Sequence, residues 1–341
     1  MGEVTLTRAF FRFAGLAAAL SFGWHVSGAA AEAIKLGTLK QAPYGIASIA
    51  QQKGYFAAEG LDVDIVTFDS AEPVPVGVVS GDLAFGIVGT SAAMFSLATQ
   101  GALKLIGGNQ REVPRFQYEA IVASRRAYAA GLTTVGGFGG HSATVTQIGS
   151  PPHYGLAQLA DKYRVDLKTV RVLALQTIPN EVSALVGGQA DFGLLPSTAI
   201  LTPVERGDVA LLGWAGDEVR WQLSVIVTGA KTANAKPDLV QHFLTALRKG
   251  MRDYHDAFAG PGESREDGPT APEVYAMLAK YTGQTPQQLK SGIPYIDPEA
   301  RVDAKDIAHQ IQWFKAQGML KGELDPAGFI DARYALTLAD K

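Results

Sequence analysis

Short apolar runs alternate along this chain with segments whose aliphatic residues recur every three or four positions. The runs are typical of buried strands, and the longer spacing is typical of amphipathic helices. The predicted strands cover residues 34–39, 63–68, 84–88, 103–107, 144–148, 170–175, 192–195 and 223–228. Long helices are predicted at residues 237–257, 271–281 and 303–317. Strands that alternate with helices indicate βαβ units and a largely parallel sheet.

Part of this pattern occurs twice. Residues 44–54 (YGIASIAQQKG) align with residues 154–164 (YGLAQLADKYR) at an offset of 110 positions. Residues 80–92 (SGDLAFGIVGTSA) align with residues 187–199 (GGQADFGLLPSTA) at an offset of 107. Two matches in the same order at nearly one spacing favour an internal duplication. The alternative is the recurrent composition of α/β proteins, in which Ala-rich helices and glycines at helix ends are common.

The duplication predicts two similar α/β lobes joined by a hinge, which is the expected fold class. The strand at residues 223–228 is expected to return across the hinge, and the helices after it are expected to pack on lobe one. Lobe one would then comprise residues 32–114 with 223–341, and lobe two residues 115–222. The polar loop at residues 260–269 is too short to free a further domain.

The first residues have the pattern of a secretory signal peptide. Arg8 and Arg12 precede an apolar run at residues 13–26, and small residues follow it. The run is too short for a membrane span, which needs about 20 residues. We expect a signal peptide at residues 1–31, with cleavage after Ala33 as the alternative. No later segment is long and apolar enough to span a bilayer, so we expect the mature protein in the periplasm.

Composition narrows the classes of function. Of the 341 residues, 47% are hydrophobic and 18% are charged, which is enough apolar content for a large core. The formal net charge is -3, so no basic excess is available for phosphates, and nucleic acid is not an expected partner. The chain has no cysteine, which excludes a disulfide, an iron–sulfur cluster and a cysteine nucleophile. The histidines show no metal-ligand spacing, and we expect neither a metal nor a cofactor.

The candidate ligand-binding residues follow from the expected fold. In an open parallel sheet, ligands bind beyond the carboxyl ends of the strands. Two lobes that face each other would form a cleft from those loops, and helices that begin there offer free N–H groups to an anion. The candidates are Lys40, Gln41, Tyr44, Ser70, Glu72, Thr90, Ser91, Arg111, Ser150, His153, Tyr154, Thr177, Ser197 and Trp214. For the hydroxyl side chains the alternative role is to cap a helix.

Five of these candidates bear on the chemistry of the ligand. Tyr44 and Tyr154 stand at equivalent helix starts, so they are expected either to close on a ligand from both sides or to pack beneath their loops. Arg111, in a polar loop after a strand, would hold an anion through two hydrogen bonds. His153, which precedes a helix, is a second candidate partner of an anion. These groups favour a small organic anion, a sulfonate or a carboxylate, and the aromatic side chains allow an aromatic one. Asp69 and Glu72 could instead bind an amine, which would fit an amino-sulfonate such as taurine.

Several segments resemble a known family. Residues 53–63 (KGYFAAEGLDV) and 80–86 (SGDLAFG) are similar to the early segments of solute-binding proteins of the nitrate, taurine and sulfonate ABC importers. The family's usual Asp is replaced by Ala84 in the first copy and is present as Asp191 in the second. The closing segment at residues 311–334 is also similar. The resemblance implies a type II periplasmic binding fold; some relatives are built around thiamine-pyrimidine precursors, so it does not name the solute.

The resemblance also implies a binding protein rather than an enzyme. The expected partners are a small-molecule solute and an ABC permease in the inner membrane, and a monomer is expected. A membrane receptor that senses the closed lobes is the alternative to the permease.

Motifs of enzymes are incomplete in this chain. Residues 140–144 (GHSAT) resemble a nucleophile elbow, but a Thr replaces the last glycine. Residues 136–140 (GGFGG) break the register of a dinucleotide-binding loop. An enzyme of the same fold that acts on a pyrimidine precursor would need a Lys and a His at facing positions, for which Lys40 and His153 are the candidates.

Overall fold

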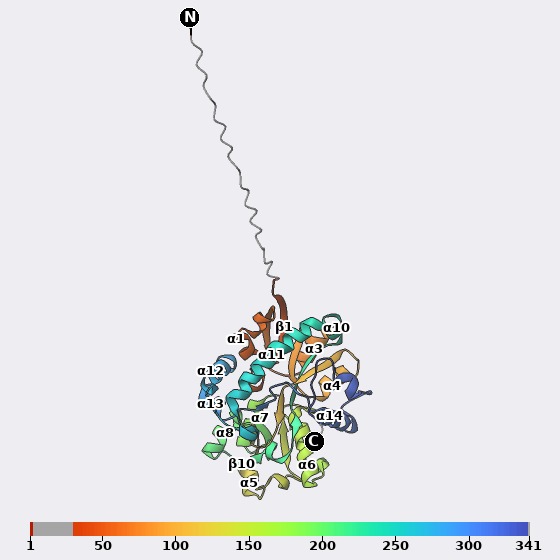
Figure 1. The fold of residues 1–341 in the computed structure, drawn as a ribbon. Coiled ribbons are helices and arrows are strands. Elements are labelled where there is room, and N and C mark those ends of the chain that lie inside the picture. Colours follow the sequence, from red (N-terminus) through yellow and green to blue (C-terminus); the bar gives the residue numbers. More distant parts are fainter. Residues whose placement is uncertain (3–29, 340–341) are drawn as a thin grey trace. The chain divides into compact units, whose positions relative to one another are not determined.

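The computed structural model describes residues 1–2 and 30–339, so the expected signal peptide lies outside the described residues. The chain divides into a short unit, Met1–Ala30, and a compact unit, Ala31–Lys341. The compact unit is built on two five-stranded sheets, and each sheet forms the centre of one lobe (Figure 1). Within the part of the chain that the structure describes, no helix is long and apolar enough to cross a membrane.

Lobe one has the strand order β2-β1-β3-β12-β4. Strand β1 runs parallel to β2 and β3, whereas β12 runs antiparallel to β3 and β4. The strands are β1 (Glu32–Leu39), β2 (Leu61–Phe68), β3 (Phe85–Gly89), β4 (Leu103–Gly108) and β12 (Ser224–Gly229).

Lobe two has the same arrangement, β8-β7-β9-β6-β10. Strand β7 runs parallel to β8 and β9, and β6 runs antiparallel to β9 and β10. The strands are β6 (Glu119–Ser124), β7 (Ser142–Val145), β8 (Arg171–Ala174), β9 (Phe192–Pro196) and β10 (Val209–Trp214). The shared order supports the duplication, with β7, β8 and β9 corresponding to β1, β2 and β3. The sheets are largely parallel, as predicted, but one antiparallel strand that was not predicted enters each sheet beside its third parallel strand.

The chain crosses between the lobes through two short segments that pair with each other. Strand β5 (Gln110–Glu112) carries the chain toward lobe two, and strand β11 (Trp221–Gln222) carries it back. A third strand, β15 (Tyr295–Ile296), pairs with β5 on its other side. The returning chain then enters the lobe-one sheet as β12, between β3 and β4; the sequence predicted this return across the hinge but not the position in the sheet.

Helices cover both sheets, and Figure 1 shows α1, α3, α10 and α11 around the first and α5, α6 and α8 at the second. Helices that precede the first crossing or follow the second are α1 (Ile46–Gln52), α2 (Tyr55–Ala58), α3 (Pro73–Ser80), α4 (Ala92–Ala98), α10 (Ala230–Ala235), α11 (Pro237–Phe258), α12 (Ala271–Thr282), α13 (Pro286–Lys290), α14 (Ala304–Ala316) and α15 (Pro326–Phe329), with the 3-10 turns η1 (Ala42–Tyr44) and η4 (Pro261–Glu263). Helices between the crossings are α5 (Arg125–Ala129), α6 (Pro151–Tyr163), α7 (Ile178–Val186), α8 (Ser197–Arg206) and α9 (Ala215–Glu218), with the 3-10 turns η2 (Val135–Gly137) and η3 (Leu167–Thr169). The three long helices predicted from periodicity correspond to α11, α12 and α14.

Equivalent aromatic residues lie in the core of each lobe. Phe85 of β3 stacks on Phe243 of α11 with ring centroids 3.9 Å apart, and Phe192 of β9 packs against Phe138 at 5.2 Å. Both strand residues are buried, which confirms the core role predicted for them.

The segment expected to be a plain loop at residues 260–269 has local structure. Strands β13 (Ala259–Gly260) and β14 (Ser264–Arg265) pair as a short hairpin. Gly262 adopts a φ of 68° in the turn, a conformation that glycine reaches without strain.

Candidate functional site

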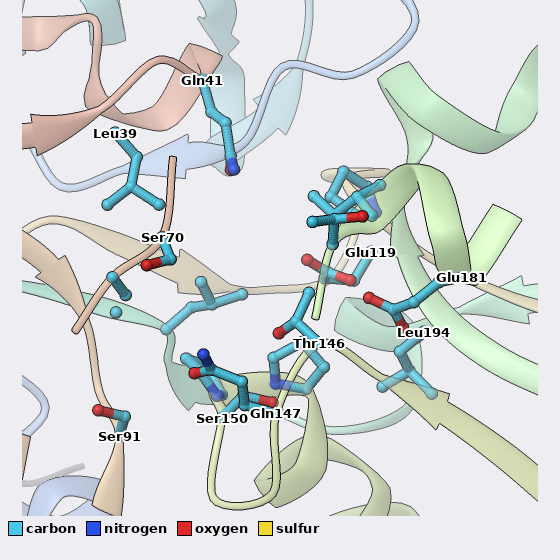
Figure 2. Close-up of a pocket in the computed structure, with 18 of the residues that line it drawn as sticks. Leu39, Gln41, Ser70, Ser91, Glu119, Thr146, Gln147, Ser150, Glu181 and Leu194 are labelled. Carbon is cyan, nitrogen blue, oxygen red and sulfur yellow. The ribbon is translucent and has the colours of Figure 1, made fainter. Parts of the chain in front are cut away.

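A cavity of about 220 Å³ lies between the two lobes. Its walls come from the loops that follow β1, β2 and β3 on one side and β7, β8 and β9 on the other. In Figure 2, Leu39, Gln41 and Ser70 approach from one side, and Glu119, Thr146 and Glu181 approach from the other. The carboxyl ends of equivalent parallel strands therefore meet across the cavity, as the architecture requires of an α/β ligand site.

The charged groups that line the cavity are all acidic. They are Asp69 and Glu72 on the loop before α3, Glu119 at the start of β6, and Glu181 in the first turn of α7. Among the described residues, no Lys, Arg or His side chain lines the cavity. A ligand would therefore meet carboxyl groups without a neighbouring basic group to neutralise them.

Glu119 and Glu181 are buried and incompletely satisfied. Each side chain is 3% exposed, and the Oε2 atom of each has no hydrogen-bond partner in the described part of the chain. Burial raises the pKa of Glu181 to about 7. Burial, and then the negative charges of Glu112 and Glu181, raise the pKa of Glu119 well above its ordinary range. Burial therefore opposes the ionisation of both groups, and an ionised Glu181 further opposes the ionisation of Glu119.

Other polar groups of the cavity wall are also unpaired. Gln110 Oε1 and Ser150 Oγ are buried and have no hydrogen-bond partner among the described residues. The rings of Tyr44 and Tyr118 line the same cavity, and both are buried. Burial raises the pKa of both phenols, so both keep their protons at neutral pH. Buried polar atoms are nearly always hydrogen-bonded, so this cluster is typical of a site that is completed by a ligand.

Half of the residues predicted from the strand-end rule line this cavity. They are Gln41, Tyr44, Ser70, Glu72, Ser91, Ser150 and Thr177. Ser91 and Thr177 also have the alternative role, since their hydroxyls accept hydrogen bonds from the backbone N–H groups of Met94 and Asn180.

Arg111, the expected anion partner, lies outside the cavity wall. It belongs to β5 rather than to a loop, and its guanidinium is 3.2 Å from the buried carboxylate of Asp297. The guanidinium also lies over the ring of Tyr295, 5.0 Å from its centroid. Its charge is therefore already matched within the protein.

His153 and Tyr154 likewise do not line the cavity. His153 is buried against Trp313, and its Nδ1 accepts a hydrogen bond from the N–H of Gly149. Burial lowers the pKa of His153 to about 4, so it is neutral at pH 7. Tyr154 donates to Asp306 of α14 at 2.8 Å, so the two equivalent tyrosines Tyr44 and Tyr154 face different surroundings.

The remaining candidates occupy four separate places. Lys40 is exposed, Thr90 donates to the carbonyl of Gln222, Ser197 is buried at the start of α8, and Trp214 is half-buried at the end of β10. None of the four lines the cavity. Lys40 and His153 therefore do not face each other across it.

The sequence analysis did not select Glu119, Glu181, Gln110 or Tyr118. A signal for Glu181 is present, because it stands three and four positions before Ala184 and Leu185 on the buried face of α7. Glu119 directly precedes the apolar run of β6 and carries no comparable signal in one sequence.

Prolines reduce the number of free N–H groups at the helix N-termini that were expected to bind an anion. Helix α6 begins with Pro151 and Pro152, helix α3 with Pro73, and helix α7 has Pro179 in its first turn. Proline has no backbone N–H, so these ends offer fewer donors than ordinary helix starts. In the described ranges 1–2 and 30–339, no group of three His, Asp or Glu side chains could hold a metal ion.

Comparisons with known proteins agree on the fold. The chain is similar to the periplasmic aliphatic sulphonate binding protein SsuA from Escherichia coli (17% identity, TM-score 0.69, 91% of this chain and 94% of that one). It is also similar to the Candida albicans CA3427 gene product, described as having the generic periplasmic binding protein fold (14%, 0.65, 90% and 98%). A third similar structure is the periplasmic nitrate-binding protein NrtA from Synechocystis PCC 6803 (13%, 0.61, 86% and 83%).

A family model identifies the family of the chain, whereas the similar structures show only its fold. No curated protein sequence matches the chain. The model of NMT1/THI5 like proteins matches residues 44–264, which is more than half of the chain. The chain therefore belongs to the NMT1/THI5-like family, and its fold is that of the periplasmic binding proteins.

Proposed function

We propose that this protein is the extracytoplasmic solute-binding component of an ABC importer. It would capture a small solute between its two lobes, close on it by bending at the paired crossover strands β5 and β11, and deliver it to a permease. No covalent step is part of this proposal. The protein would act as a monomer in the periplasm after removal of residues 1–31.

The cavity carries this proposal. It is formed by equivalent strand ends of both lobes, and four buried polar atoms in its wall lack a partner in the described chain. An interface that only held the lobes together would pair these atoms, because each buried unpaired group costs about 1–3 kcal/mol. The likeness to sulfonate- and nitrate-binding periplasmic proteins supports the same class of function.

We propose lobe boundaries and a ligand site on the same basis. Lobe one comprises residues 32–114 and 223–341, and lobe two comprises residues 115–222. The proposed ligand-binding residues are Gln41, Tyr44, Ser70, Glu72, Ser91, Gln110, Tyr118, Glu119, Ser150, Thr177 and Glu181.

The organic anion favoured by the sequence gains no support from the cavity. Arg111 is paired with Asp297, His153 is neutral and lies elsewhere, and the helix starts carry prolines. A sulfonate in this cavity would face acidic groups without a basic partner. We therefore leave the anion out of the proposal.

A thermal-shift screen tests the proposed function. The purified protein is heated with sulfonates, carboxylates, nitrate, pyrimidines, amines and amidines, each in large excess. A specific ligand at about 100 times its dissociation constant adds about 2.7 kcal/mol to the stability of the folded state. A clear shift with one chemical class supports the proposal, and the absence of a shift with every class contradicts it. Transport follows if deletion of the gene abolishes uptake of that solute by the cell.

A further inference from the structure

We propose that the cavity selects a small nitrogen cation, an amine, amidine or guanidine, whose N–H groups are held between the carboxyl groups of Glu119 and Glu181. This inference rests on the proposed function and names the class of solute for the same site.

The arrangement of hydrogen-bonding atoms supports a donor-rich ligand. The unpaired atoms in the wall include Glu119 Oε2, Glu181 Oε2 and Gln110 Oε1, all of which are acceptors when the carboxyl groups are ionised. Figure 2 shows Glu119 and Glu181 next to each other at the same end of the cavity. Their carboxyl groups are close enough for the charge of Glu181 to raise the pKa of Glu119. A nitrogen with two or three N–H donors would bridge them, whereas a sulfonate offers only acceptors.

The charges around the cavity also favour a cation. Glu112 of β5 raises the pKa of Glu119, and Asp69 and Glu72 from the loop of lobe one line the same cavity. Tyr44 and Tyr118 contribute neutral rings, whose faces attract cations. Every described basic side chain lies outside the lining, so a cation entering the cavity gains attraction that nothing in the wall offsets.

Binding of a cation would release protons. In the empty cavity, burial opposes the ionisation of Glu119 and Glu181, and the charge of Glu181 opposes that of Glu119 further. A bound cation favours the ionised form of both, so each carboxyl group that pairs with it gives up its proton to solvent. Affinity should therefore rise with pH from 5.5 to 8, in which range Glu181 titrates.

The alternative use of the same two groups has the opposite pH dependence. If protonated carboxyl groups donated hydrogen bonds to a neutral carbonyl compound, affinity would fall as pH rises. The two cases are separated by charge-matched ligands and by the pH profile.

The experiment uses sets of ligands that share a shape and differ in charge. Benzamidine, benzamide and benzoate form an aromatic set, and butylamine, butanol and butyrate form an aliphatic set. Thermal shifts of the purified protein rank the members of each set. Calorimetric titration of the best ligand at pH 5.5 and 8, in buffers of different ionisation enthalpy, gives the affinity and the protons released. Glu181→Gln and Glu119→Gln keep the size of the side chain, and Glu205→Gln on the exposed surface of α8 is the matched control.

The expected result is a shift with a cationic member and none with its anionic counterpart. Affinity should rise about tenfold or more between pH 5.5 and 8, with net proton release. Glu181→Gln and Glu119→Gln should each weaken binding by about tenfold to a hundredfold, the usual worth of a hydrogen bond to a charged group. Glu205→Gln should leave it unchanged.

Three outcomes would overturn the inference. A shift with an anionic member, or equal shifts with neutral and cationic members, would contradict selection of a cation while leaving solute binding in place. An affinity that falls with rising pH would do the same. Failure of these ligands and of every class in the broader screen would contradict the proposed function and the inference with it.

Discussion

Two groups of buried polar side chains in this protein differ in whether the chain itself pairs them. At the contact of α6 with α14, both carboxylate oxygens of Asp306 accept hydrogen bonds, from Tyr154 at 2.8 Å and from Gln222 N–H and Gln310 Nε2 at 2.7 Å. In the cavity, Glu119 and Glu181 are as deeply buried, but one oxygen of each has no partner among the described residues.

The contrast separates a structural role from a binding role. The Asp306 group joins α6 of lobe two to α14 and to the crossover strand β11. Its hydrogen bonds offset part of the cost of burial, which still raises the pKa of Asp306 to about 6. The unpaired oxygens of Glu119 and Glu181 accept no hydrogen bond from the described residues, and burial without partners costs stability. Side chains that the fold pairs hold the structure together, whereas unpaired side chains that also line the cavity, as Glu119 and Glu181 do, are available to a ligand.

The largest expected effect comes from removing the paired carboxylate. Asp306→Ala leaves the Tyr154 hydroxyl, the Gln222 N–H and the Gln310 amide without their acceptor. We expect a loss of about 3–5 kcal/mol in the free energy of unfolding, measured by denaturant titration, because three donors lose their acceptor at about 1–3 kcal/mol each. Asp161→Ala, an exposed position on α6, is the control and should change it by less than about 0.5 kcal/mol. Equal stability of the two variants would show that the Asp306 group has no structural role.

Replacing the carboxyl group of Glu181 by an amide should instead raise the free energy of unfolding. The pKa of Glu181 is about 7 in the folded chain and 4.5 when exposed, so the folded state binds its proton more tightly. Its contribution to stability is complete below pH 4.5 and is lost as pH rises through 7. Glu181→Gln cannot ionise and should be more stable than the parent by about 3 kcal/mol at pH 8, at about 1.4 kcal/mol per pKa unit.

The stability difference between the parent and Glu181→Gln should depend on pH, which separates the effect of ionisation from other effects of the substitution. At pH 4.5 the parent carboxyl group is protonated, so the difference between parent and Glu181→Gln should nearly vanish. Unfolding curves at both pH values measure this, with Glu205→Gln as the control. A destabilised Glu181→Gln variant at pH 8 would mean that the carboxylate has a structural partner, as Asp306 does.

The smallest expected changes in stability concern Tyr44 and Tyr154, the two tyrosines at equivalent positions of the repeat. Tyr154→Phe removes the hydroxyl that donates to Asp306 and lies 2.7 Å from His309 Nδ1, and should cost about 1–2 kcal/mol of stability without weakening ligand affinity. Tyr44→Phe removes a hydroxyl at the cavity and should weaken affinity while changing stability by less than about 0.5 kcal/mol. Denaturant titration and calorimetry on both variants test this pair. The same effect of both substitutions on affinity would remove the distinction between the two positions.

The repeated pattern was sufficient to predict the two lobes, because βαβ units leave strong local signals. The return of residues 223–228 to the first sheet also followed, since the second copy had no place for that strand. The antiparallel strand in the middle of each sheet was missed, because strand direction depends on the chain crossing between lobes rather than on local periodicity.

The site was predictable only where strand ends determine it. Tyr44, Ser70 and Ser150 follow strands or begin helices at the cavity, and the rule for parallel sheets found them. The sequence singled out Asp69 and Glu72, which line the cavity, as groups that could bind an amine. It did not reveal Glu119 and Glu181, because a buried carboxyl group has the same letter as an exposed one. Arg111 misled for the converse reason, since its partner Asp297 lies far away in the sequence.

A crystal structure of the protein with its stabilising solute bound would show where the solute lies. We predict density for the solute between the lobes, with a nitrogen within hydrogen-bond distance of Glu119 Oε2 and Glu181 Oε2. Density for the solute outside the cavity, or a bound anion that contacts neither carboxyl group, would contradict this prediction.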